Sequence, residues 1–126
     1  MGKRKVLIAL YIFFILWVTL FTREPRATRL VTGLLWEVKN HVWVDIKINI
    51  LLFIPLGFLL GISTNSWKSV IYGFLLSIFI EISQYVFLLG YCQADDVLNN
   101  TIGIAVGFGV WKMLSVFIEK WKNKRV

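Results

Sequence analysis

The sequence predicts an all-α polytopic membrane helix bundle of about four transmembrane helices, with an amphipathic interfacial segment between the first and the second. Of the 126 residues, 58% are hydrophobic and 17% are charged, whereas about 25% of the residues of a soluble domain are charged. The apolar residues form four runs, each near the roughly 20 residues that cross a bilayer as a helix. The formal charge is +7, and because the basic residues flank these runs, membrane orientation is favoured over nucleic-acid binding.

The first span is predicted over residues 5–22, within MGKRKVLIALYIFFILWVTLF. A basic start followed by an apolar stretch is also typical of a secretory signal peptide. However, this apolar run is long for a signal peptide, and no small-x-small cleavage site follows it. We therefore expect an uncleaved first transmembrane helix.

Residues 23–46 mix apolar and charged side chains. The apolar ones follow helical spacing: Leu30, Leu34, Leu35, Val38 and Val42. With Trp36 and Trp43 as anchors, the pattern is typical of an amphipathic segment that lies at the membrane interface. A short re-entrant piece is the alternative.

The remaining spans are predicted over residues 47–64, 67–90 and 96–117. The second span contains Pro55, which predicts a kink there. Polar turns at 62–66 and 90–96 connect the three spans. The whole chain, residues 1–126, is therefore interpreted as one membrane domain.

The basic residues near the span ends set the expected orientation. Eight of them lie on the side of the amino terminus: Lys3, Arg4, Lys5, Lys68, Lys120, Lys122, Lys124 and Arg125. Five lie on the other side: Arg23, Arg26, Arg29, Lys39 and Lys47. Both termini are therefore expected in the cytoplasm, and the loop at 90–96 is expected outside.

Each of the last three spans carries a stripe of small and polar residues at spacings of three or four, which is the spacing of neighbours on one helix face. The second span has Asn49, Phe53, Gly57 and Gly61. The third has Gly73, Ser77, Glu81 and Gln84. The fourth has Asp96, Asn99 or Asn100, Gly103 and Gly107. Glycines four residues apart allow two helices in a membrane to approach closely.

Antiparallel packing of these spans brings their polar residues to the same depth, in the outward third of the membrane. The predicted ligand-binding pocket consists of Asn49, Glu81, Gln84, Asp95, Asp96, Asn99 and Asn100. Glu81 and Gln84 would form its floor, because they lie deepest. Ionisable residues inside a membrane are costly and are usually functional. In the alternative interpretation, a protonated Glu81 only links helices, and Asp95 or Asp96 only caps the fourth helix.

Three segments of the chain together resemble the VanZ-like family of small bacterial membrane proteins. They are NILLFIPLGFLLG at 49–61, SIFIEISQ at 77–84 and DDVLNNTIGIAVG at 95–107. The family pattern is carried by Asn49, Phe53, Pro55, Gly57, Glu81, Gln84, Asp95, Asp96, Val97, Asn100, Gly103 and Gly107. The chain departs from the family at Gly90 and Gln93, where many members have an arginine and an acidic residue.

This resemblance implies a multi-pass protein of the bacterial cytoplasmic membrane. The family is associated with resistance to glycopeptide antibiotics, notably the lipid-bearing teicoplanin. The implied partners are membrane lipids and a lipid-linked cell-wall precursor or the lipoglycopeptide itself. No nucleic acid, cofactor or metal is expected, and the sequence does not indicate an oligomeric state.

Three classes of function stay open on the sequence. The favoured one is non-enzymatic binding of an amphiphile in the outward-facing polar pocket. The second is an enzyme that modifies an envelope lipid, with Glu81 as general base and Asp95 or Asp96 as a second acid, base or metal ligand; no recognised catalytic constellation is present. The third is an oligomeric transporter or channel.

Overall fold

The computed structural model describes residues 2–22 and 29–126 of the chain. Its main elements are four helices that are long and apolar enough to cross a membrane. The first comprises α1 and a π-helical continuation, η1; the others are α3, α4 and α5. Their bounds are α1 Lys3–Leu16, η1 Trp17–Phe21, α3 Trp43–Thr64, α4 Lys68–Val86 and α5 Ala94–Lys124. The predicted all-α class with four transmembrane helices is confirmed.

Three of the predicted helix ends differ from the structure by four residues or more. α3 begins at Trp43 rather than at residue 47. α4 ends at Val86 rather than at residue 90, because Leu88 and Gly90 have φ of 57° and 134°, which an α-helix does not allow. α5 continues to Lys124, beyond the predicted end at 117. The extra residues of α5 are largely polar and continue the helix past the apolar run.

The segment between the first and second spans is not a continuous amphipathic helix. Within residues 29–42, the only helix is α2, Trp36–Lys39, and the last four residues of the predicted segment already belong to α3. Leu35 and His41, which flank α2, have φ of 60° and 57°, and this left-handed conformation interrupts a helix on both sides. Residues 23–28 lie outside the described part of the chain. The predicted helical spacing from Leu30 to Val42 is therefore wrong as a guide to local structure, while interfacial placement stays a prediction.

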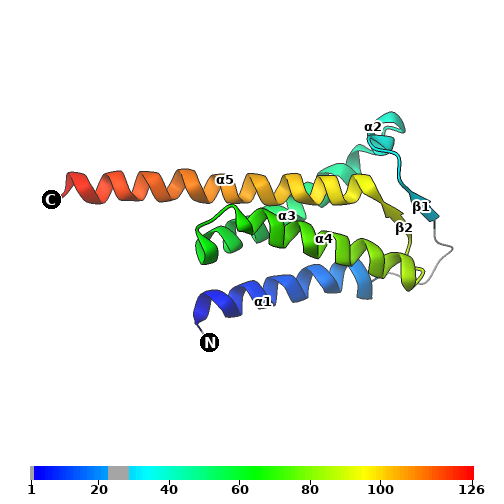
Figure 1. Cartoon of the computed structure of the whole chain (residues 1–126), viewed down its shortest axis with the longest axis horizontal. Helices are drawn as coiled ribbons and strands as arrows, with labels where there is room; N and C mark the ends of the chain where they lie inside the picture. The colour runs from blue at the N-terminus through cyan, green and yellow to red at the C-terminus, as the bar shows by residue number, and fades with distance from the viewer. Residues whose placement is uncertain (1, 23–28) are drawn as a thin grey trace.

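Before α2, the chain forms strand β1, Arg29–Val31, which pairs in parallel with strand β2, Tyr91–Gln93. In this register Leu30 lies opposite Cys92. The segment from β1 to α2 therefore folds over the end of the bundle at which α5 begins (Figure 1). We refer to residues 29–42 as the cap.

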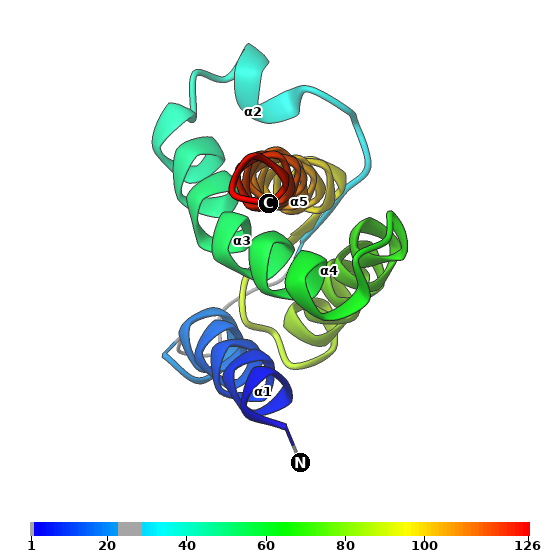
Figure 2. The ribbon, with the colours of Figure 1, turned by 90° about the vertical axis from the view of Figure 1, so that its left-hand side faces the viewer.

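The helices pack in a fixed order across the bundle. α3 lies between α5 and α1, and α4 lies beside α3 (Figures 1 and 2). The contact between α3 and α5 depends on glycines: a Cβ atom on Gly57 would meet the backbone of Ile104, and one on Gly103 would meet the carbonyl of Ile50. The predicted use of these small residues for close helix packing is confirmed.

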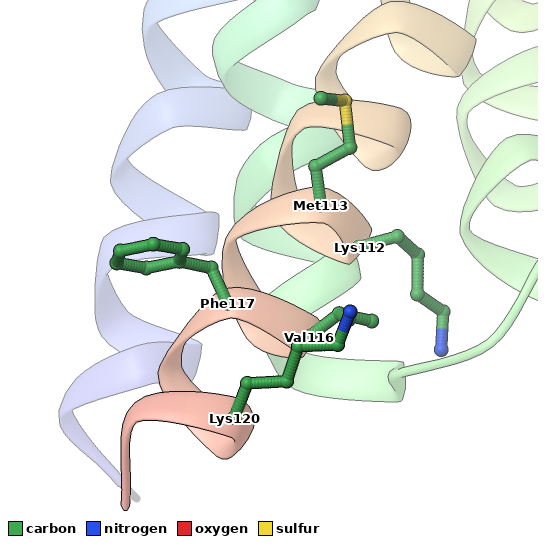
Figure 3. A pocket seen from close by; sticks show the side chains of 5 residues that line it. All are labelled: Lys112, Met113, Val116, Phe117 and Lys120. Carbon is green, nitrogen blue, oxygen red and sulfur yellow. The ribbon is translucent and has the colours of Figure 1, made fainter. Parts of the chain in front are cut away.

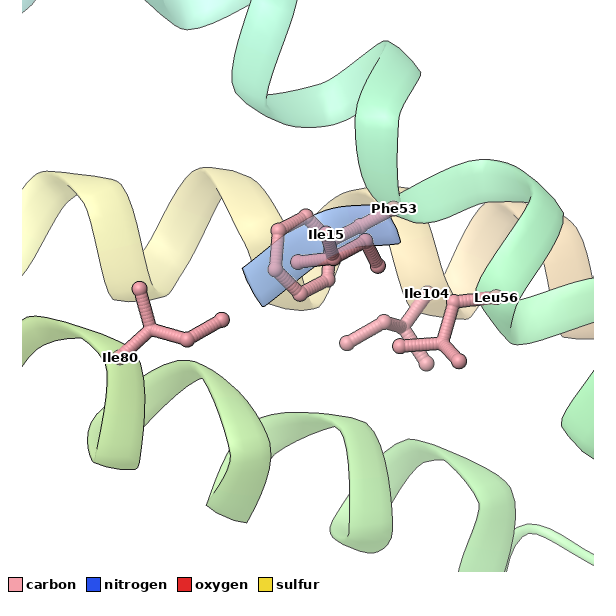
Figure 4. Packing of buried hydrophobic residues seen from close by; sticks show 5 residues of the cluster. All are labelled: Ile15, Phe53, Leu56, Ile80 and Ile104. Carbon is pink, nitrogen blue, oxygen red and sulfur yellow. The ribbon is translucent and has the colours of Figure 1, made fainter. Parts of the chain in front are cut away.

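A small apolar core lies where the four long helices meet. Figure 4 shows its members, which are Ile15, Phe53, Leu56, Ile80 and Ile104. The Tyr11 hydroxyl donates a hydrogen bond of 2.7 Å to the carbonyl of Leu52 and so joins α1 to α3. Most other large apolar side chains face outward, among them Phe13, Phe21 and Leu51, as expected for helices surrounded by lipid.

Candidate functional site

The polar residues of the spans converge at one end of the bundle, opposite the two chain termini. At this end α3 begins, α4 ends, α5 begins and the cap crosses over them (Figure 1). The buried polar side chains found here are Glu37, Glu81, Gln84, Asp95, Asn99 and Asn100, while Asn49 and Asp96 are half-buried. The structure thus places all seven predicted site residues at one end of the bundle and adds Glu37, which the sequence did not indicate.

Asp95 holds the cap in place. Its Oδ1 accepts a hydrogen bond from the backbone N–H of Leu35 at 2.6 Å, and its Oδ2 accepts one from the N–H of Glu37 at 2.8 Å. Asp95 is only 3% exposed. Both carboxylate oxygens therefore accept hydrogen bonds from backbone N–H groups at the start of α2. The alternative prediction, in which this residue caps its own helix, is wrong: the residue before α5, Gln93, is the N-cap, and no side-chain bond caps that helix.

Glu37 joins the cap to α5. Its side chain is 2% exposed. Its Oε2 accepts a hydrogen bond of 2.7 Å from the Nδ2 of Asn99, and its carboxyl group is also hydrogen-bonded to Asp96. Asp96 in turn accepts a hydrogen bond of 2.6 Å from the Nδ2 of Asn49 on α3. We call this set of residues the acidic latch: Glu37, Asn49, Asp95, Asp96 and Asn99.

The surroundings of Glu37 raise its pKa from 4.5 to about 8. Burial is the largest cause, followed by the hydrogen bond to Asp96 and by repulsion from Asp96, Asp95 and Asp45. Because two adjacent carboxylates are stable only when they share a proton, Glu37 is protonated at neutral pH and can donate to Asp96. Within the acidic latch, Glu37 and Asp96 thus form a hydrogen-bonded carboxyl pair rather than two repelling charges.

This protonation predicts that the cap is weaker at alkaline pH. A carboxyl whose pKa is raised on folding stabilises the folded state below its ordinary pKa, and this stability is lost as the pH rises from 4.5 to about 8. We expect the thermal unfolding midpoint of the purified protein to fall between pH 6 and pH 9. In Glu37→Gln, the side-chain amide donates a hydrogen bond in place of the carboxyl proton, so the unfolding midpoint should fall clearly less over the same pH range. An equal fall in both proteins would contradict a protonated Glu37.

A second polar group lies along one face of α4, and we call it the α4 stripe: Ser77, Glu81 and Gln84. The Oε2 of Glu81 accepts a hydrogen bond of 3.0 Å from the backbone N–H of Gln93. Ser77 accepts one of 2.9 Å from the Nδ2 of Asn100. Gln84 donates one of 3.0 Å to the carbonyl of Thr19 in η1. The stripe therefore connects α4 to η1, to α5 and to strand β2, which precedes α5.

The predicted residues thus fall into two neighbouring groups. Asn49, Asp95, Asp96 and Asn99 belong to the acidic latch, while Glu81 and Gln84 belong to the α4 stripe. Asn100, next to Asn99 in the chain, bonds to the stripe. Both asparagines therefore form hydrogen bonds in this region, Asn99 in the acidic latch and Asn100 with the α4 stripe.

Three side-chain oxygens in and around the stripe have no hydrogen-bond partner among the described residues. They belong to Gln84, Gln93 and Asn100. Each oxygen can only accept a hydrogen bond, and each of these atoms is itself shielded from solvent. A buried acceptor without a donor costs about 1–3 kcal/mol. This end of the bundle is therefore short of hydrogen-bond donors.

The described residues give less support to a metal site or to a nucleophilic cysteine. Within residues 2–22 and 29–126, no group of three or more His, Cys, Asp or Glu side chains is arranged to hold a metal ion. The Cys92 thiol in β2 has a pKa raised by burial and by the negative charges of Glu81 and Asp96. It is therefore in its protonated, weakly nucleophilic form at neutral pH.

The chain is similar in sequence to a known protein family over most of its length. The sequence model of the family described as VanZ/LLP1 matches residues 8–116, a range that includes the acidic latch, the α4 stripe and the glycines between α3 and α5. Protein VanZ of Enterococcus faecium is 27% identical over 142 aligned positions, which cover all of this chain and 85% of that protein. No solved structure matches the chain. Since the match extends over most of its length, this chain belongs to the VanZ/LLP1 family.

Proposed function

We propose that this protein lowers the susceptibility of a bacterial cell to lipid-bearing glycopeptides such as teicoplanin by binding an amphiphile at the polar end of the bundle. The amphiphile is the antibiotic itself or a lipid-linked cell-wall precursor. Family membership supports the association with teicoplanin resistance. The observation that carries the binding proposal is the set of buried acceptor oxygens without partners on Gln84, Gln93 and Asn100.

These oxygens favour a ligand with hydrogen-bond donors. A sugar hydroxyl or an amine that reached them would recover the energy that each unpaired acceptor costs. The carboxylates of Asp95 and Asp96 lie at the same end of the bundle, and their negative charge disfavours a phosphate. We therefore expect the sugar or amine part of the amphiphile to bind here, with its hydrocarbon tail among the surrounding lipids.

The cap would control access to this site. Two of its residues, Leu34 and Leu35, are 62% and 52% exposed, so the cap presents apolar surface at the end of the bundle. A hydrocarbon chain that contacted this surface would stay close to the polar groups beneath it. In this proposal the acidic latch opens and closes the entrance, while the α4 stripe forms the floor.

We further propose that the protein lies in the cytoplasmic membrane with both termini in the cytoplasm. Both termini lie at the end of the bundle away from the polar site (Figure 1). Basic residues gather at the terminal end: Lys3, Arg4, Lys5, Lys68, Lys112, Lys120, Lys122, Lys124 and Arg125. Such a bias is typical of the cytoplasmic side, and it leaves the site facing outward, where glycopeptides act.

The test compares two substitutions of Glu81 in cells that are challenged with teicoplanin or with a glycopeptide that has no lipid tail. Glu81→Ala removes the acceptor for the Gln93 N–H and should remove most of the teicoplanin protection. Glu81→Gln keeps an oxygen acceptor and should retain most of it. Glu119→Gln near the far end of α5 makes the same charge change away from the site and should behave as wild type.

Two outcomes would overturn the binding proposal. Equal protection against both glycopeptides would show that the lipid tail is not recognised. Complete loss of teicoplanin protection in Glu81→Gln, as in Glu81→Ala, would indicate that the function needs an ionisable carboxyl group and not only a hydrogen-bond acceptor.

The second outcome would favour the alternative of an envelope-lipid enzyme, for which the structure offers one specific observation. The Glu37–Asp96 carboxyl pair, with the pKa of Glu37 raised to about 8, has the properties that general acid–base catalysis uses. Asp95 suits this role less, because both of its oxygens accept backbone hydrogen bonds. Mass spectrometry of envelope lipids from cells with and without the protein tests this alternative, which requires a modified lipid.

A further inference from the structure

The side-chain amide of Gln84 has a fixed orientation. Its Nε2 donates a hydrogen bond of 3.0 Å to the carbonyl oxygen of Thr19, and a carbonyl oxygen can only accept. The atom left without a partner among the described residues is therefore the acceptor, Oε1. The Thr19 hydroxyl does not supply a donor, because it donates to the carbonyl of Ile15 at 2.8 Å. Since Gln84 is 2% exposed, its oxygen needs a donor that the described chain does not provide.

Two further acceptors without partners follow the same packing of α4 against β2 and α5. The backbone N–H of Gln93 donates to Glu81 at 3.0 Å, and Glu81 precedes Gln84 by three residues, which makes them neighbours on one helix face. Asn100 donates to Ser77, one turn further along α4. The unpartnered oxygens of Gln84 and Gln93 therefore lie nearer the carboxyl-terminal end of α4, and that of Asn100 lies deeper.

The electrostatic potential at this end of the bundle is negative. The carboxylate of Asp95 is 3% exposed and accepts hydrogen bonds from neutral backbone N–H groups. Burial, and then the negative charges of Asp96 and Asp95, raise the pKa of Glu37 in α2. Burial, and then the negative charges of Glu81 and Asp96, raise the pKa of the Cys92 thiol in β2. A potential that opposes the loss of a proton on two different elements also favours a bound cation.

The unpartnered atoms and this potential together select one kind of head group. A primary ammonium has three N–H donors and no acceptor, whereas a hydroxyl has one donor and two lone pairs that themselves need donors. The amide nitrogens of Gln84 and Asn100 already donate to Thr19 and Ser77. A group that only donates and that carries a positive charge therefore matches this end of the bundle better than a sugar hydroxyl does.

The hollow near the opposite end has the reverse charge. This hollow of about 460 Å³ on α5 is lined by Lys112, Met113, Val116, Phe117 and Lys120 (Figure 3). The ammonium groups of its two lysines repel a second cation. The hollow therefore does not compete for a cationic head group, and its lysines provide a control.

We infer that the group recognised at the α4 stripe is a primary ammonium in the head of the amphiphile, which donates hydrogen bonds to the side-chain oxygens of Gln84 and Gln93. This inference rests on the proposed function and narrows its ligand to an amine-bearing amphiphile. Because the oxygens are shielded from solvent in this structure, the ammonium reaches them only when the cap has moved aside. The cost of removing its water is offset by these hydrogen bonds and by the nearby carboxylates.

The test compares three amphiphiles with the same alkyl chain: dodecylamine, dodecyl glucoside and dodecyltrimethylammonium. Calorimetric titration measures their binding to the full chain in phosphatidylcholine nanodiscs at pH 7, where an alkylamine is protonated, and empty nanodiscs correct for partition into lipid. We expect dodecylamine to bind at least about tenfold more tightly than the other two, because hydrogen bonds from a charged donor are stronger than neutral ones. The glucoside has donors without charge, and the trimethylammonium has charge without N–H donors.

Gln84→Met removes the acceptor oxygen and should lower the affinity for dodecylamine about tenfold, while binding of the other two amphiphiles stays unchanged. Gln93→Met should act in the same way, and it leaves the bond between Gln84 and Thr19 intact, so a folding defect of one variant does not decide the result. Lys120→Gln, which changes the hollow on α5, is the control and should bind dodecylamine as wild type does.

Three outcomes would overturn the inference. Tighter binding of dodecyl glucoside would replace the ammonium by a sugar and leave the proposed function standing. Equal binding of dodecylamine and dodecyltrimethylammonium would show that only general charge attraction acts. Heats equal to those of empty nanodiscs for all three amphiphiles would contradict both this inference and the proposed function.

Discussion

Replacing Gly107 with leucine is expected to separate α3 from α5 and to destabilise the bundle by about 3 kcal/mol. A Cβ atom at this position would meet the carbonyl oxygen of Ile54 and the backbone nitrogen of Phe58. These are backbone atoms of a helix, so they cannot rotate away as a side chain would. The two helices must therefore move apart along much of their contact, and the packing around Ile104 is lost with it.

Gly109 provides a matched control on the same helix, because a Cβ atom there would meet nothing within 4 Å. Gly109→Leu is therefore expected to unfold near the wild-type temperature. Thermal unfolding in detergent, followed by far-UV circular dichroism, measures both variants. Similar midpoints for Gly107→Leu and Gly109→Leu would contradict the close approach of α3 and α5.

Asp95→Ala is expected to detach the cap while leaving the four long helices folded. The substitution leaves the backbone N–H groups of Leu35 and Glu37 without acceptors, at about 1–3 kcal/mol for each buried group. It also removes one of the carboxyl groups beside Glu37. If the cap closes the binding site, protection against teicoplanin should be lost as well.

Hydrogen exchange followed by mass spectrometry measures this detachment directly. Peptides from residues 29–42 should exchange at least about tenfold faster in Asp95→Ala, since losing 1.4 kcal/mol already opens a segment ten times more often. Peptides from α4 should be unchanged. The matched control is Glu119→Ala on the same helix, which should leave cap exchange as in wild type. Slow exchange of the cap in Asp95→Ala would refute the role of Asp95.

The four long helices were predictable because each is encoded within one stretch of chain. An apolar run of about 20 residues has few alternatives to a transmembrane helix, since its backbone must satisfy its own hydrogen bonds in lipid. The glycines at 57, 103 and 107 were predictable for the same reason, because their spacing places them on one helix face. The convergence of polar residues such as Glu81 and Asn100 at one end followed from antiparallel packing of these helices.

The cap was not predictable from local pattern. Its strand β1 pairs with β2, about 60 residues away, and three-residue strands carry too little periodicity to recognise. Its helix α2 has only four residues, because Leu35 and His41 take left-handed conformations. Neither residue is a glycine, so nothing in the sequence marks these positions as turns.

Glu37 was missed because a charged residue in an amphipathic segment normally faces water. Only the long-range contacts with Asp96 and Asn99 show that it is buried. The available signal was its position between the apolar residues Trp36 and Val38, together with the number of amide and carboxyl groups at the start of α5. The contact of Asp95 with the cap was missed for a related reason, since the backbone groups that it binds belong to a distant segment.

The account depends on the cap lying against the start of α5, and a cross-link tests this most directly. Leu30 and Cys92 are paired in the parallel ladder of β1 and β2, and neighbouring strands lie about 4.8 Å apart, within the range that a disulfide can bridge. Oxidation of the Leu30→Cys variant in membranes is predicted to give an intramolecular disulfide to Cys92, found as a linked peptide and absent when Cys92→Ser is added. Failure to form this bond, or a bond between two chains only, would contradict the cap and the acidic latch beneath it.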